Sequence, residues 1–146
     1  MNAVIVQAGD GRVFARPATG GSVTIKVASG AVTVFEARRK AGDAGGPGLH
    51  SHQGFDETFY VLSGEWEFVA GDETVIAAAG TVVHLPRGVP HAFRSTGRED
   101  GTLLGVANPG GIEEFFEEAA RTSDDEAAGL HHGIRWAKSM GATHKP

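Results

Sequence analysis

The 146-residue chain contains no cysteine, which excludes disulfide bonds, thiolate metal ligands and a cysteine nucleophile. Positive charge is also in short supply. Lysine and arginine number 13 against 18 aspartate and glutamate, and this net charge of −5 argues against nucleic acid or an anionic membrane as the main partner. No apolar run approaches membrane-spanning length, and the first residues lack the pattern of a signal peptide. We therefore expect a soluble, cytoplasmic protein.

No internal repeat and no break between domains is visible along the chain. A length of 146 residues is enough to bury a sizeable core. The hydrophobic content of 40% with 21% charged residues is ordinary for a globular protein. We predict one domain over residues 1–146, with a barrel over about 20–108 and a helical tail over 111–140.

Short segments of alternating or β-branched residues, separated by glycine-containing turns, make up most of the chain. In residues 22–28, for example, Val23, Ile25 and Val27 alternate with polar residues, as in a strand with one wet face. Many short strands with turn residues between them indicate an all-β sandwich or barrel. We predict strands in residues 3–8, 12–17, 22–28, 31–39, 57–63, 65–71, 73–79, 81–85, 91–95 and 101–107.

After residue 111 the hydrophobic period changes from two to 3.6, which predicts a helix. Its apolar stripe consists of Ile112, Phe115, Phe116, Ala119 and Ala120. Residues 123–126, with the sequence SDDE, have the pattern of a capping box that begins a second helix, which Gly133 would end. We expect the paired phenylalanines to close one side of the sandwich.

Residues 38–49 combine a basic cluster, RRK at 38–40, with a glycine-rich segment, AGDAGGPGL at 41–49. The basic cluster is either the solvated end of a strand or an electropositive rim that orients an acidic substrate. Four glycines and a proline exclude a regular helix or strand from the second segment. That segment is either a plain connector or a lid at the rim of the site that begins at His50.

Four residues with metal-binding side chains occupy two short stretches of the sequence. His50 and His52 alternate, so on a strand their imidazoles leave the same face, roughly 7 Å apart. A turn at 53–56 would bring the carboxylate of Glu57 back toward them. In the second stretch, a strand and a turn rich in proline and glycine lead to His91. Three imidazoles and a carboxylate suit divalent Zn, Fe, Mn, Ni or Cu.

Two roles are open to Glu57, which is either the fourth metal ligand or a general base beside the metal. By alternation His84 faces away from the core, whereas His131 and His132 lie on the tail and could fold over the pocket mouth. Any of these three that reached the metal would complete an all-histidine shell and release Glu57. The candidate pocket wall is apolar and draws on Phe59, Val61, Trp66, Phe68, Val83, Leu85 and Phe93.

Both stretches resemble the two motifs of the cupin superfamily, G(X)5HXH(X)4E(X)6G and G(X)5PXG(X)2H(X)3N. The matching residues are His50, His52, Glu57 and Gly64 in the first motif, and Gly80, Pro86, Gly88 and His91 in the second. Ala44 stands in place of the opening glycine, and Ser95 in place of the closing asparagine. The resemblance implies a double-stranded β-helix, or jelly roll, with one or two short C-terminal helices and with His50, His52, Glu57 and His91 as metal ligands and catalytic residues.

Within that superfamily, the chain resembles small single-domain cupins, both aromatic polyketide cyclases and quercetinase-like enzymes. This resemblance implies a metal-dependent cyclase of secondary metabolism, such as antibiotic biosynthesis, with Zn as the favoured ion. The substrate would be a hydrophobic aromatic or polyketide-type small molecule. One alternative is a dioxygenase with a redox-active metal, and another is a cupin that only binds a small molecule. We also expect a homodimer, since edge strands of jelly rolls are often covered by dimerisation.

Overall fold

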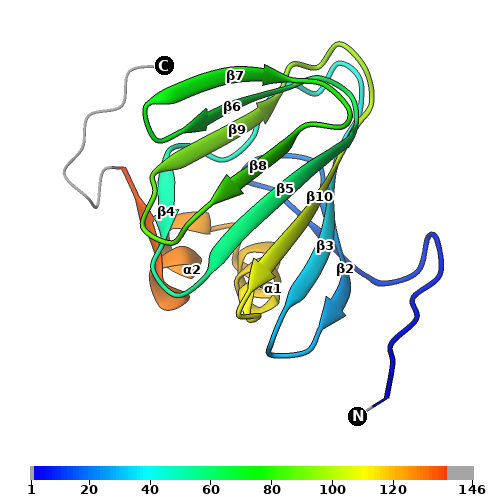
Figure 1. Cartoon of the computed structure of the whole chain (residues 1–146). Helices are drawn as coiled ribbons and strands as arrows, with labels where there is room; N and C mark the ends of the chain where they lie inside the picture. Colours follow the sequence, from blue (N-terminus) through cyan, green and yellow to red (C-terminus); the bar gives the residue numbers. More distant parts are fainter. Residues whose placement is uncertain (1, 138–146) are drawn as a thin grey trace.

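Two antiparallel sheets pack face to face in the computed structural model, which describes residues 2–137 (Figure 1). The first sheet has the order β1 (Arg12–Ala15), β2 (Ser22–Ala28), β3 (Thr33–Arg39), β10 (Gly101–Asn108), β5 (Asp56–Ser63) and β8 (Val82–Leu85). The second has the order β11 (Ile134–Trp136), β4 (His50–His52), β9 (His91–Ser95), β6 (Trp66–Ala70) and β7 (Glu73–Ala77). Consecutive strands such as β3, β4 and β5 belong to alternate sheets, so the chain crosses repeatedly from one sheet to the other. The predicted jelly-roll sandwich is confirmed.

Alternation of inward and outward side chains builds the core between the two sheets. In β10, every second residue from Gly101 to Ala107 is buried. Phe59 of β5 contacts aromatic rings from both sheets, with its centroid 6.0 Å from that of Phe35 on β3 and 5.8 Å from that of Phe68 on β6. The inner faces are therefore joined by an aromatic cluster.

Two helices close one end of the sandwich, α1 (Ile112–Thr122) and α2 (Asp125–His131) (Figure 1). The predicted stripe of α1 is buried at Ile112, Phe115, Phe116 and Ala119. The ring of Phe116 packs edge-on against Phe35, with centroids 5.2 Å apart. The prediction that α1 packs on the sandwich is confirmed. No helix within residues 2–137 is long and apolar enough to cross a membrane.

Three expectations about local structure are wrong. Residues 3–8 form no strand: the segment pairs with neither sheet, and Ile5 is 83% exposed, so no burial offsets the cost of ordering the backbone. Ser123 does not cap the second helix but ends α1 in the left-handed conformation, and Asp124 caps α2 by accepting the N–H of Ala127. The tail also returns to the second sheet as β11, and its expected residues 138–140 lie outside the described part of the chain.

Candidate metal centre

Two neighbouring strands of the second sheet bring the three motif histidines together. His50 and His52 lie on β4, and His91 opens β9 directly opposite His50 in the antiparallel register. All three side chains are buried, and one ring nitrogen from each lies within 4.8 Å of the others. Among the described residues, they form the one group of three or more potential ligands that could hold a metal ion.

Backbone carbonyls fix the orientation of two of these imidazoles. Nδ1 of His50 lies 2.7 Å from the carbonyl oxygen of Gly48, and Nδ1 of His91 lies 2.9 Å from that of Val89. Because a carbonyl oxygen only accepts, each Nδ1 carries the proton and each Nε2 presents a lone pair. Nε2 of His52 and of His91 are buried with no hydrogen-bond partner. Buried nitrogens of this kind are rare unless something else satisfies them, and a metal ion would do so.

Glu57 reaches the same place from β5 of the opposite sheet. Its Oε1 lies 3.2 Å from Nε2 of His52 and 3.4 Å from Nε2 of His91. Ligand atoms on one tetrahedral ion with bonds of about 2.0–2.2 Å lie roughly 3.3–3.5 Å apart. These separations are therefore those expected of ligands that share an ion.

Electrostatics favour an ionised Glu57 and a neutral His50. Burial works to raise the pKa of Glu57, but the attraction of His52 and His91 outweighs it and lowers the pKa well below its usual range. Burial is also the main cause that lowers the pKa of His50 well below 6.5, followed by the like charges of His91 and His52. A neutral imidazole and an ionised carboxylate are the forms that bind metal. The residues present thus fit a divalent ion.

The three remaining candidate histidines in the described chain do not join this cluster. His84 faces outward from β8, as predicted, and its Nδ1 lies 2.8 Å from Oγ1 of Thr58. His131 and His132 both pair with Glu118, at 2.8 and 3.5 Å. None of them is placed to replace Glu57.

A cavity beside the histidines is open to the site. It has about 60 Å³ of space for the centre of a water molecule, which is room for several waters or one compact organic molecule. Of the seven predicted wall residues, Phe59, Trp66 and Phe93 line it. The other four are buried in the core elsewhere: Val61, Phe68, Val83 and Leu85. Sequence reasoning missed most of the wall, namely Phe35, Ile112, Phe115, Phe116, Ile134 and Trp136.

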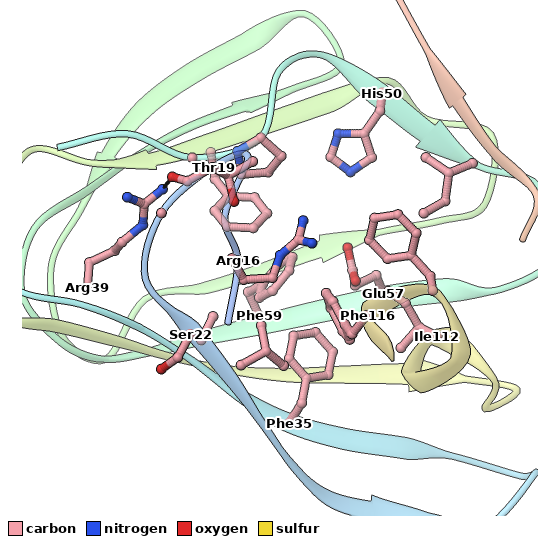
Figure 2. A pocket seen from close by; sticks show the side chains of 18 of the residues that line it. Arg16, Thr19, Ser22, Phe35, Arg39, His50, Glu57, Phe59, Ile112 and Phe116 are labelled. Atoms are coloured by element: carbon pink, nitrogen blue, oxygen red, sulfur yellow. Dashed lines mark hydrogen bonds between the residues drawn. The ribbon is translucent and has the colours of Figure 1, made fainter. Parts of the chain in front are cut away.

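Two buried arginines also line the cavity, each 7% exposed. Arg39 comes from the predicted basic cluster, whereas Arg16 belongs to no motif. The glycine-rich segment contributes Gly46 and Pro47 to the wall. A Cβ on Gly46 would lie 2.0 Å from the carbonyl oxygen of Phe93, so this close approach requires glycine. Figure 2 shows Arg16, His50 and Glu57 directed into the same pocket.

Comparison with known proteins places residues 40–107 in the family described as "Cupin domain". An oxalate-binding protein from Thermotoga maritima is 36% identical over 70 residues, which are 48% of this chain and 58% of that protein. An uncharacterized protein from Streptomyces coelicolor is 37% identical over 67 residues, or 46% of this chain and 63% of that protein. The chain therefore spans less than two thirds of the length of these curated relatives.

Solved structures share the fold at low sequence identity. KdgF from Halomonas sp. matches with a TM-score of 0.65 at 15% identity, over 77% of this chain and 98% of that one. A predicted oxalate decarboxylase from Thermotoga maritima gives 0.59 at 23%, over 73% and 99%. The nucleoside dehydratase Pac13 gives 0.59 at 17%, over 77% and 87%. These likenesses establish the architecture alone.

Proposed function

Because this chain belongs to the cupin superfamily, we propose that it is a metal-dependent enzyme for a compact aromatic or polyketide-type molecule in secondary metabolism. The observation that carries this proposal is the buried group of His50, His52 and His91, joined by Glu57, beside an aromatic cavity. The family, by itself, makes an enzyme plausible without naming its reaction.

The reaction that we favour is an aldol-type cyclisation followed by aromatisation. A divalent ion held by the three histidines and Glu57, with Zn as our first expectation, would supply a Lewis acid for a carbonyl oxygen. A base takes the proton from a C–H bond next to that carbonyl, and the electron pair of the broken bond stays on the substrate as an enolate. The enolate carbon forms a C–C bond to the carbon of a second carbonyl of the same molecule, whose oxygen takes up the proton as its C=O π bond breaks. Loss of this hydroxyl with a neighbouring hydrogen as water, followed by enolisation, gives the aromatic ring.

The cavity walls support this substrate class by their shape and chemistry. Phe59, Phe93 and Trp66 from the sheets line the same space as Phe115 and Phe116 of α1. Flat apolar walls favour a planar ring system over a sugar. The small volume further favours a molecule of one or two rings over a long extended chain.

The other functional expectations stay proposals of the same kind. Exposed apolar side chains on β8 and on β7, Val82 and Ile76, are suited to a homodimer interface. The absence of cysteine is compatible with the cytoplasm, where disulfides rarely form. Neither proposal is needed for the chemistry of the site.

The proposed function is tested by metal analysis combined with two simple substrates. Protein purified without added metal is analysed by mass spectrometry for Zn, Fe, Mn, Ni and Cu. Acetophenone in D₂O then reports enolisation, because its methyl protons exchange for deuterium when a base removes them. We expect bound zinc, exchange in the metal-loaded protein and none after chelation. A redox metal with oxygen uptake on quercetin and no exchange would instead identify a dioxygenase, and the absence of metal would leave a binding protein.

A further inference from the structure

Arg16 places a permanent positive charge inside the aromatic cavity. It follows β1, is 7% exposed and lines the same cavity as His50, His52 and Glu57 (Figure 2). The guanidinium carbon lies 5.2 Å from the ring centroid of Phe115 and 5.3 Å from that of Phe116. These cation–π contacts hold the planar group against α1.

Asp125 pairs with Arg16 across 109 residues of sequence. Nη1 donates to Oδ1 at 3.1 Å and Nη2 donates to Oδ2 at 2.8 Å. A buried ion pair of this kind is weak evidence for stability, because well-packed apolar side chains of similar volume usually serve as well. Because this pair lies in the wall of a cavity, a role in binding accounts for it better than a role in stability.

The geometry of the pair leaves Arg16 able to bind a second oxyanion. A guanidinium has five N–H donors, and Asp125 uses one from each terminal nitrogen. The edge that includes Nε is not part of this pairing, and it has the fork geometry that matches a carboxylate. Arginine also stays charged at any physiological pH, so the site attracts an anion throughout this range.

Arg39 differs in a way that makes it a matched control. It lines the same cavity and is equally buried, but Nη1 donates to Asp43 and Nη2 to the carbonyl of Thr19. A Cβ on Gly20 or Gly21 would collide with its side chain, and both glycines have positive φ. Arg39 therefore links the loop at Asp43 to the loop at Thr19, and we assign it a structural role.

We propose that Arg16 is the anchor for a carboxylate or similar oxyanion on the substrate. This inference rests on the proposed function of the cavity and narrows the substrate to an acidic aromatic compound. Arg16 holds the charged end through its Nε edge, while Asp125 and the rings of Phe115 and Phe116 keep the guanidinium in place. Arg16 lies outside residues 40–107, so the anchor is independent of the segment that defines the family.

The test compares benzoate with benzamide, its neutral counterpart of the same shape, by isothermal titration calorimetry. Metal-free protein at pH 8 is used, so the result depends neither on metal nor on turnover. Arg16→Lys keeps the charge but loses the fork, so we expect benzoate to bind about tenfold to a hundredfold more weakly. Benzamide binding should be unchanged, and Arg39→Lys should alter neither ligand by more than about threefold.

Asp125→Asn supplies a second variant with an effect of opposite sign. It removes the charge that neutralises Arg16 and keeps the size of the side chain, so benzoate should bind more tightly while benzamide does not change. The proposal is overturned if wild type binds benzoate no better than benzamide, if Arg16→Lys weakens both ligands equally, or if Asp125→Asn weakens benzoate. If acetophenone exchange fails but these results hold, the anchor stands and the cyclase proposal alone is wrong.

Discussion

Replacing Glu57 by glutamine tests whether this carboxylate is a metal ligand or a free base. The change keeps the shape of the side chain and removes its charge. The amide can donate from its NH₂ group to Nε2 of His52 or of His91, which lie 3.2 and 3.4 Å from the present Oε1. Both nitrogens lack a hydrogen-bond partner. These hydrogen bonds should keep the metal-free protein folded, so that its stability can be measured with and without metal.

Metal binding by Glu57→Gln should weaken. Loss of an anionic ligand should weaken zinc binding by at least about a hundredfold. Loss of a residue that only hydrogen-bonds to a metal ligand already weakens metal binding by about tenfold to a hundredfold. At a zinc concentration 1,000 times the wild-type Kd, the metal stabilises the fold by about 4.1 kcal/mol, and a hundredfold weaker site retains about 1.4 kcal/mol. The difference of about 2.7 kcal/mol corresponds to a loss of about 5–10 °C in the zinc-induced rise of Tm.

Differential scanning fluorimetry with and without zinc measures both quantities, and competition with a fluorescent chelator gives the Kd. Acetophenone exchange is measured on the same samples. The reasoning is refuted if Glu57→Gln binds zinc within about threefold of wild type while exchange falls at least about a hundredfold, the range for loss of a general base. Glu57 would then move the proton and take no part in holding the ion.

Three further predictions concern the ligands, the tail and pH. His91→Ala should abolish stoichiometric metal in elemental analysis, and full occupancy would rule out the site as described. Phe116→Ala should lower the free energy of unfolding by about 3–5 kcal/mol in urea titration, because Phe116 packs on Phe35; a change within about 0.5 kcal/mol would contradict that packing. Since the pKa of His50 is lowered in the folded state, the unfolded chain binds more protons below pH 6.5. With chelator present, stability should therefore fall from pH 7.5 to 5.5, by at most about 1.4 kcal/mol per pH unit for one proton, and a flat profile would contradict a neutral, buried His50.

The group of three histidines could be predicted because the two stretches that carry it match the spacing of the two cupin motifs. His50 and His52 share one strand, and short turns lead to Glu57 and to His91. Alternation then decides which face each side chain takes, and for His84 it gave the correct outward face. The helical stripe of α1 could also be predicted, because its period lies within 11 residues.

Features that depend on contacts between distant segments could not be predicted. The pairing of Arg16 with Asp125 joins residues 109 positions apart, and neither residue has a local pattern that names the other. β11 is only three residues long and exists because β4 offers it an edge. Residues 3–8 show the converse, since their composition suits a strand but they pair with neither sheet. A composition that favours a strand is not sufficient, because the segment also needs a neighbouring strand to pair with.

The two halves of the cavity come from different parts of the chain, and this division bears on how far the relatives inform its chemistry. The family match over residues 40–107 includes all three histidines and Glu57. The opposite wall comes from outside that segment, with Arg16, Phe35 and the tail residues Phe115, Phe116 and Trp136. Residues 40–107 therefore supply the candidate ligands together with Phe59, Trp66 and Phe93 of the wall, whereas Arg16 lies outside them. Under the proposal that Arg16 anchors the substrate, the residue that selects an acidic ligand lies outside the segment that the family match covers.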